Sequence, residues 1–319
     1  MVQTCLPSKN TPHKSPRLAV SGPPNGSIRP VGINRAGNEG ATMTALDTGT
    51  PDLLARVEGH VAVISFNRPA ARNALSDAMY DGFARVLPQI AADQDIRVVM
   101  VTGEGGAFCS GGDVKGMNAR HKGDGASAPR GTSTETAVAH LRKIQSQVST
   151  SLRRLPQPVV ASLPGAAAGA GLSIALSADL RIAAERAIIV TAFANVGASG
   201  DFGTSFFLTR IVGEAKAKEL MFTSPRLTAR EAREYHMVNA VLPDEGYEEA
   251  ALNWCHDLAQ RAPIALQYMK ANVNRAYDVT LEAALDAEAT GMVRTMSTAD
   301  HREAAAAFVE KRPPRFTGA

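Results

Sequence analysis

Two short apolar runs constrain this chain more than any other feature. Residues 96–101 and 158–163 are predominantly apolar and rich in β-branched side chains, interrupted only by Arg97 and Ser162, which is typical of strands buried on both faces. Each run leads into a cluster of very small residues, at 103–113 and 164–172, that opens a helix. The order of strand, small-residue turn and helix predicts an α/β fold.

The flanking segments fit the same class. Apolar residues over 57–66 predict a strand hairpin that turns at Glu58 and Gly59, and helical spacing predicts helices over 75–91 and 138–152. Farther along, we expect a helix over 170–178, strands over 180–183 and 187–190, and a capping box formed by Thr228 with Glu231. Three amphipathic helices are predicted to follow, over 244–261, 263–277 and 280–311.

Composition divides the chain into three regions. Residues 1–48 are rich in Pro, Gly, Ser, Asn and Thr without periodicity, which predicts a disordered N-terminal tail. An organelle transit peptide is the alternative, but six prolines between Pro7 and Pro30 disfavour its amphipathic helix. We predict an α/β core over 49–255 and an α-helical oligomerisation region over 256–319.

Bulk properties exclude several classes of function. The 319 residues are 45% hydrophobic, but the net charge is only +3 and aromatics are 5%, which disfavours a nucleic-acid partner. No apolar run approaches the roughly 18 residues of a membrane-spanning helix, so we expect no membrane partner. Three scattered cysteines are too few for a disulfide framework or a CxxC metal site. We therefore expect no metal and a reducing, cytoplasmic location.

The two small-residue turns have the composition of anion sites. Small side chains let a ligand approach the backbone, and free NH groups at a helix start favour negative charge. Residues 165–171 read GxxxGxG, so a dinucleotide motif is absent, as are a P-loop and a GxSxG nucleophile elbow. Close packing of helix on strand is the alternative use of these glycines.

Four motifs resemble those of the crotonase (enoyl-CoA hydratase/isomerase) superfamily. They begin at Asn67 (Asn-Arg-Pro-x-x-Arg-Asn-Ala-Leu), Phe108 (Phe-Cys-Ser-Gly-Gly-Asp-Val-Lys), Gly165 (Gly-Ala-Ala-Ala-Gly-Ala-Gly-Leu-Ser) and Ala307 (Ala-Phe-Val-Glu-Lys-Arg-Pro-Pro-Arg-Phe-Thr-Gly). The resemblance covers about 54–318. It implies a spiral of ββα units with a C-terminal helical region, and assembly as a homotrimer or homohexamer.

The resemblance also implies a ligand and an oxyanion hole. The ligand is an acyl-coenzyme A thioester, so coenzyme A is part of the substrate and no separate cofactor is expected. The backbone NH groups of Ser110 and Ala170 would hold the thioester oxygen as it becomes an enolate. Main-chain donors of this kind suit a developing oxyanion because they are preorganised. Cys109, just before Ser110, is expected to pack as a small residue rather than act as a nucleophile.

Both glutamates of the family's hydratases are absent. Ser173 and Phe193 stand at their positions, and neither can take a proton as a carboxylate does. Asp201 matches the position at which dienoyl-CoA isomerases and epoxyphenylacetyl-CoA isomerases of the superfamily carry a catalytic aspartate. The alternative for Asp201 is a cap on a helix over 202–211. Ser173 is expected to bind substrate or water, or to be an ordinary helix serine.

The remaining site residues are also implied by the resemblance. Coenzyme A is expected to contact main-chain groups and basic side chains of Arg72, Ala74, Gly112, Lys115 and Lys311. The acyl pocket is expected to include Met117, Phe193, Phe206 and Phe207. The long Gly-rich loop over 117–133 would cover a bulky acyl group, or be plain disorder.

Three functions stay open at this point. The first is a double-bond isomerase that uses Asp201 as acid and base. The second is a hydratase, or an acyl-CoA hydrolase or lyase, whose water is positioned by Asp201 or Ser173. The third is an acyl-CoA-binding protein without catalysis.

Overall fold

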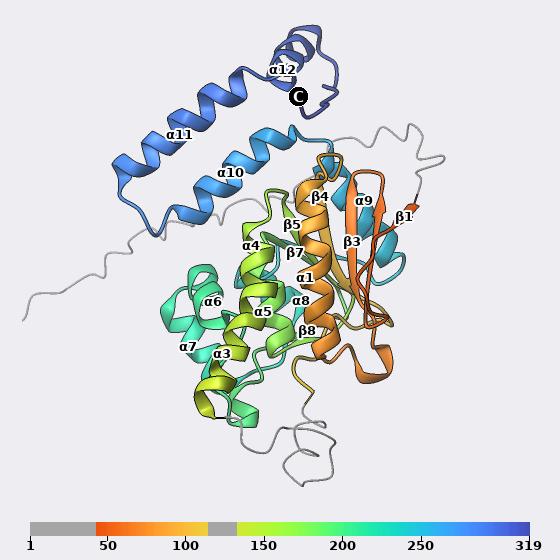
Figure 1. The fold of residues 1–319 in the computed structure, drawn as a ribbon, viewed down its shortest axis with the longest axis vertical. Helices are drawn as coiled ribbons and strands as arrows, with labels where there is room; N and C mark the ends of the chain where they lie inside the picture. Colours follow the sequence, from red (N-terminus) through yellow and green to blue (C-terminus); the bar gives the residue numbers. More distant parts are fainter. Residues whose placement is uncertain (1–42, 114–132) are drawn as a thin grey trace, which may run out of the picture. The chain divides into compact units, whose positions relative to one another are not determined.

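A large mixed sheet forms the centre of the described chain (Figure 1). The computed structural model describes residues 43–113 and 133–319, all within one compact unit, and structural statements below concern these residues. Strand order is β1-β2-β3-β4-β5-β7-β10, antiparallel from β1 to β3 and parallel from β3 to β10. The strands are β1 (Met43–Ala45), β2 (Leu53–Glu58), β3 (Val61–Phe66), β4 (Val98–Gly103), β5 (Val159–Leu163), β7 (Leu180–Ala184) and β10 (Ala240–Leu242).

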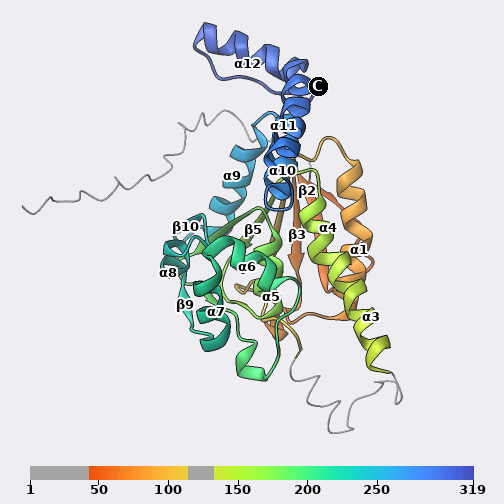
Figure 2. The ribbon, with the colours of Figure 1, turned by 90° about the vertical axis from the view of Figure 1, so that its left-hand side faces the viewer.

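Both faces of the sheet are covered by helices, which explains the continuous apolar runs (Figure 2). Side chains alternate along each strand. On β3, Val61 and Val63 pack toward α9 (Tyr247–Ala259), whereas Ile64 packs with the layer that contains α1 (Asp77–Ala92). The predicted hairpin and both buried strands are confirmed.

The order strand, strand, helix repeats along the chain. It is seen in β2, β3 and α1, again in β5, β6 and α5, and again in β7, β8 and α6. The second strand of the later repeats joins a separate sheet, β6-β8-β9. The predicted α/β class with ββα repeats is therefore confirmed. The new elements are β6 (Ala167–Ala168), α5 (Ala170–Ser177), β8 (Ile188–Val190), α6 (Thr204–Val212) and β9 (Leu227–Thr228).

The helices begin at capping residues that the sequence supplies. Ser76 accepts the Met79 N–H at the start of α1. Thr228 and Glu231 form the predicted capping box of α8 (Ala229–Glu234). The sequence did not predict α7 (Glu214–Thr223), which follows α6 after Gly213.

The predicted helix over 138–152 is not a uniform α-helix. It consists of α3 (Thr134–Gln145), a π-helical turn η2 (Ser146–Thr150) and α4 (Ser151–Arg154). The apolar residues Ile144, Val148 and Leu152 of the predicted stripe are buried. The stripe was therefore recognised, but the wider π turn within it was not.

Two predicted boundaries are wrong. Residues 43–48 belong to the ordered unit, because β1 pairs with β2 and the Thr48 hydroxyl donates to the Leu53 carbonyl at 2.7 Å. The predicted domain boundary between residues 255 and 256 falls inside α9. The apolar face of this helix packs against the sheet on both sides of that boundary. The C-terminal helical region therefore begins at α10 (Pro263–Arg275).

The last predicted helix, over 280–311, is two helices. These are α11 (Leu281–Met296) and α12 (Ala299–Glu310), and Thr298 between them caps α12 by accepting the His301 N–H. A threonine at an N-cap starts a new helix because its hydroxyl satisfies an otherwise unpaired N–H. Helices α10 and α11 lie side by side as an antiparallel pair (Figure 1).

Candidate active site

A short main-chain bridge holds the two small-residue turns side by side. Cys109 and Ala167 pair in parallel, with the Ala168 N–H donating to the Cys109 carbonyl at 3.0 Å and the Cys109 N–H donating to the Ala166 carbonyl at 3.2 Å. These turns follow β4 and β5, which are neighbours in the sheet. Adjacent parallel strands thus bring together two clusters that lie about 60 residues apart in sequence.

Two glycines allow this close approach. Gly111 has φ +89°, and a Cβ atom there would lie 2.8 Å from the Ala168 oxygen and 3.2 Å from the Ala170 nitrogen. A Cβ atom at Gly171 would lie 2.4 Å from the Cys109 oxygen. Any larger residue at either position would push the turns apart, so these glycines serve the site as well as the packing.

Ala170 is the first residue of α5, and its N–H has no acceptor among the described residues. Unpaired N–H groups at a helix start carry partial positive charge. The Ala170 N–H is therefore available to donate to an anionic oxygen.

The second expected donor is already engaged. The Ser110 N–H donates to the Arg72 carbonyl at 3.1 Å. Arg72 and Asn73 both have left-handed backbone conformations, with φ values of 51° and 56°. The sequence did not reveal this contact, because it depends on the path of the first signature loop. A substrate oxygen must share or replace the Arg72 carbonyl at this donor.

Asn73 holds that loop from inside the protein. Its side chain is fully buried. The amide nitrogen donates to the carbonyls of Glu104 and Ala107, and the amide oxygen accepts the Arg68 N–H at 2.8 Å. Sequence reasoning assigned no role to Asn73, although its place in the first motif was a signal that could have done so.

Asp201 is half-buried and does not cap a helix. Helix α6 begins after Gly203, and the main-chain carbonyl of Asp201, not its carboxylate, accepts from Thr204. Carboxylate atom Oδ1 instead accepts the Gln145 amide at 2.7 Å and the Phe202 N–H at 2.7 Å. The helix-cap alternative is therefore wrong. Gln145 is a site residue that the sequence did not reveal, because it contacts Asp201 across 56 residues.

Ser173 is fully buried, and its hydroxyl is taken up by protein groups. It donates to the Gly169 carbonyl at 3.0 Å and contacts the Thr204 hydroxyl. Thr204 in turn donates to the Asp201 carbonyl at 2.8 Å. This chain of hydroxyls links the first turn of α5 to the Asp201 segment, and it leaves no hydroxyl proton of Ser173 for a water.

A cavity of about 1200 Å³ lies between the segment 145–156, the start of α6 and α10. Phe206 and Phe207, two of the residues predicted for the acyl pocket, line this cavity, and Gln145 and Phe202 connect it to Asp201. Neither Ser110 nor Ala170 lines this cavity. It therefore adjoins the Asp201 side of the site and not the oxyanion donors. Phe193 is buried, before a short 3-10 turn, and lies outside the lining.

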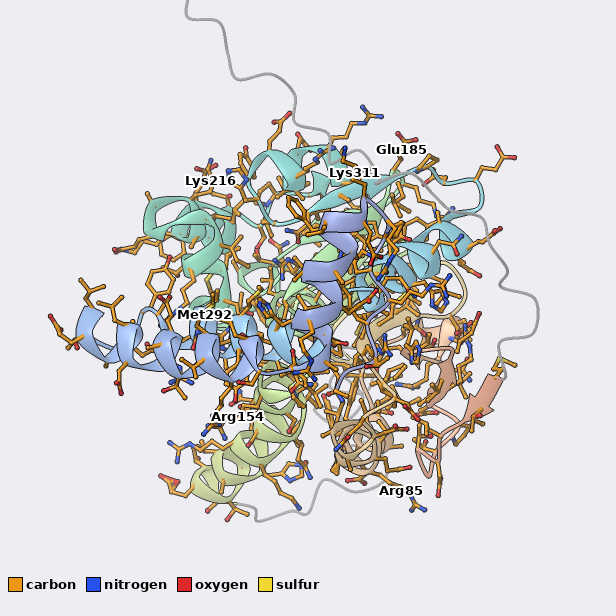
Figure 3. The ribbon with its side chains drawn as sticks, turned by 90° about the horizontal axis from the view of Figure 1, so that it is seen from above. Arg85, Arg154, Glu185, Lys216, Met292 and Lys311 are labelled. Atoms are coloured by element: carbon orange, nitrogen blue, oxygen red, sulfur yellow. The ribbon has the colours of Figure 1, made fainter. Side chains whose placement is uncertain are left out.

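The expected coenzyme A residues divide into three groups. Arg72, Ala74 and Gly112 cluster at the first motif: the Arg68 guanidinium donates to the Ala74 carbonyl at 2.7 Å, and Gly112 bridges to Leu75. Lys311 ends α12 (Figure 3), and no interaction in the described chain joins it to the two turns. Lys115, Met117, the loop over 117–133 and most of the predicted tail lie outside the described residues.

Burial keeps the thiols of the described part protonated. Cys109 is fully buried, and desolvation raises its pKa to about 12. A thiol with this pKa is a poor nucleophile at neutral pH. Packing is therefore its role in this structure, in agreement with the expectation from sequence.

The described residues contain neither a metal-binding cluster nor a membrane-spanning helix. No group of three or more His, Cys, Asp or Glu side chains could hold a metal ion. Among the helices described, none has the length and apolar character needed to cross a membrane.

Comparison with known proteins decides the family. The pattern of the enoyl-CoA hydratase/isomerase family matches residues 56–319. The chain belongs to this family. It is 33% identical over 266 residues to the 1,2-epoxyphenylacetyl-CoA isomerase of Escherichia coli K12, covering 83% of this chain and 98% of that protein. It is 32% identical over 270 residues to human enoyl-CoA hydratase domain-containing protein 2, mitochondrial, covering 83% and 88%.

Solved structures of this family share the fold. An enoyl-CoA hydratase from Polaromonas sp. JS666 matches with a TM-score of 0.75 at 32% identity, covering 83% of this chain and 99% of that one. A putative enoyl-CoA hydratase from Streptomyces coelicolor A3(2) matches with a TM-score of 0.77 at 30% identity, covering 90% and 100%. The crotonase-like fold and family are thus established for this enoyl-CoA hydratase/isomerase family member.

Proposed function

We propose that this family member isomerises acyl-coenzyme A thioesters by moving a carbon–carbon double bond, with Asp201 as the proton-carrying group. One observation carries the proposal. Asp201 holds a carboxylate bonded to Gln145, which lines the cavity, whereas Ser173 and Phe193 stand where the family's hydratases carry glutamates. A single carboxylate can move one proton between two carbons, but hydration also requires an activated water.

The reaction is balanced without any other reactant. In a 3-enoyl thioester, the Asp201 carboxylate removes a proton from the α carbon, and the C–H electrons delocalise to the thioester oxygen as a dienolate. The NH groups of Ala170 and Ser110 stabilise this oxyanion, and Ser110 shares its donor between the Arg72 carbonyl and the substrate. The Asp201 carboxylic acid then returns the proton to the γ carbon. The double bond moves from β,γ to α,β, and no atom is gained or lost.

Two further points favour isomerisation. The Ser173 hydroxyl is occupied by Gly169 and Thr204, which disfavours a water positioned by Ser173. The Escherichia coli relative is named an isomerase, of 1,2-epoxyphenylacetyl-CoA. We also retain acyl-coenzyme A as the substrate class, with no separate cofactor, and a cytoplasmic location as parts of the proposal.

Turnover of 3-enoyl, 2-enoyl and dienoyl thioesters in deuterated water tests the proposal. We expect shifted double bonds with deuterium incorporation, and a loss of at least about 10²-fold in kcat for Asp201→Asn with unchanged binding. Asp257→Asn on the exposed face of α9 is the control and should keep full activity. A hydroxyacyl product would favour the hydratase alternative, binding without turnover would favour a binding protein, and an active Asp201→Asn variant would remove the assigned role.

We propose self-association as well. Large apolar side chains stay exposed along α10, α11 and α12, where Val293 is 67% exposed and Phe308 is 86% exposed. A surface of this kind marks an interaction site, because isolated soluble chains rarely leave such patches uncovered. Assembly as a homotrimer or homohexamer would cover the exposed faces of these helices. Figure 3 labels Met292, which lies on α11.

A further inference from the structure

The backbone at Phe202 is unusual for its residue type. Phe202 has φ +50°, a left-handed conformation that a bulky aromatic residue rarely adopts. Its ring is 1% exposed and stacks on the Tyr80 ring with centroids 5.7 Å apart. A strained backbone persists where surrounding contacts over-determine it, and such positions cluster at functional sites. The residue just before Phe202 is Asp201.

The surrounding contacts come from the π-helical turn η2. The Ser149 hydroxyl within η2 donates to the Phe202 carbonyl at 2.9 Å. Gln145, the residue before η2, donates its amide to Asp201 Oδ1 at 2.7 Å. A π turn inserts an extra residue into a helix and so changes which side chains point the same way, which is why single π turns are frequent at functional sites.

The two oxygens of the Asp201 carboxylate are not equivalent. Oδ1 accepts two hydrogen bonds, one from Gln145 and one from the Phe202 N–H. No hydrogen bond to Oδ2 is present among the described residues. Oδ1 is thus fixed in place by the protein, and Oδ2 is the atom left for proton transfer.

We infer that Gln145, held by the η2 turn, is a positioning residue that orients the Asp201 carboxylate. This inference rests on the proposed function, because it assigns Asp201 as the base. Gln145 therefore sets the direction of Oδ2, the oxygen left for proton transfer.

Gln145→Met tests the inference, because methionine keeps the length of the side chain and removes the amide donor. We expect kcat at pH 7 to fall about tenfold with KM within about twofold. In Gln145→Glu a second carboxylate would face Asp201 and could not donate the hydrogen bond, so kcat should fall at least as far.

Gln147→Met is the matched control. Gln147 lies in the same π turn and, in the described part of the chain, makes no side-chain hydrogen bond. The kcat and KM of this variant should equal those of the unmodified protein. Retained binding of an acyl-coenzyme A ester shows that each variant is folded.

The outcomes separate this inference from the proposed function. If Asp201→Asn is inactive while Gln145→Met keeps the kcat of the unmodified protein, the role of Gln145 is wrong. If Asp201→Asn is fully active, the proposed function itself is wrong. A Gln145→Met variant that loses activity only through a higher KM would also overturn the inference, since it would indicate a binding role.

Discussion

The carbonyl oxygen of Arg72 lies 3.1 Å from the amide nitrogen of Ser110 and accepts its N–H. This contact joins the first motif to the first small-residue turn. Ala170, by contrast, offers an N–H without an acceptor in the described chain. The two main-chain donors of the proposed oxyanion hole therefore differ, and the 72–73 turn contacts only one of them.

Removal of the Asn73 side chain should release this turn. Asn73→Ala leaves two partly buried carbonyls and one partly buried N–H without their partner. We expect a loss of about 2–4 kcal/mol in the free energy of unfolding, measured by denaturant titration. Asn67→Ala is the control, because Asn67 makes one exposed side-chain bond to the Pro51 carbonyl, and it should cost less than about 1 kcal/mol. Equal losses for both variants would contradict the role of Asn73.

Gly111→Ala should disrupt the contact between the two turns. The added methyl would lie 2.8 Å from the Ala168 oxygen, next to the Ala170 N–H. We expect kcat/KM to fall at least about 10²-fold, because small displacements of an oxyanion donor are costly. Gly106→Ala is matched in backbone, with φ +77°, but nothing lies within 4 Å of its methyl. It should cost only about 1–2 kcal/mol of stability and leave catalysis intact.

The buried thiols should resist modification in the folded protein. Burial raises the pKa of Cys109 and of Cys255 to about 12, from 9.0. In a Cys5→Ser background, we expect no reaction with iodoacetamide at pH 8 until denaturant is added, as followed by mass spectrometry.

The raised pKa values of Cys109 and Cys255 also predict how the free energy of unfolding changes with pH. Between about pH 9 and 12 the unfolded chain has lost these thiol protons and the folded chain has kept them. The thiols therefore contribute stability below pH 9 that is lost as pH rises toward 12. Replacing both cysteines with alanine should flatten the decline in that range. A decline of unchanged slope would contradict the assignment.

Burial should decide how much two lysine–carboxylate ion pairs of equal N···O distance contribute to the free energy of unfolding. Lys270 in α10 pairs with Asp179 at 2.7 Å with its side chain 8% exposed, and Lys216 pairs with Glu219 at 2.7 Å with its side chain 30% exposed. We expect Lys270→Ala to cost about 3 kcal/mol, since Asp179 is left without its cation. Lys216→Ala should cost less than about 1 kcal/mol. Thermal denaturation compares them, and a smaller loss for Lys270→Ala would refute the argument.

A charge on the exposed apolar face of α11 should weaken self-association. Met292 is 59% exposed in the single chain. We expect Met292→Glu to lower the sedimentation coefficient toward that of a monomer. Ala91→Glu, on the exposed end of α1, adds the same charge elsewhere and should leave assembly unchanged. A protein that sediments as a monomer before any substitution would overturn the proposed oligomer.

Local patterns in the sequence determined the class of the fold. Runs such as 158–163 are apolar on both sides of a strand, so they specify burial between two layers wherever they lie. The same holds for the capping box at Thr228, which is closed within four residues. The small residues around Ser110 and Ala170, through their resemblance to family motifs, indicated an oxyanion site, because a main-chain site requires small side chains above all.

Only the tertiary structure decided how that site is completed. Gln145 reaches Asp201 across 56 residues, and Arg72 occupies the Ser110 N–H from a separate loop. The left-handed Phe202 is likewise held by distant segments, since Ser149 donates to its carbonyl and the Tyr80 ring stacks on its ring. Sequence periodicity reports which face of a segment is buried, but a single hydrogen bond between two loops depends on the path of both chains and leaves no periodic signal.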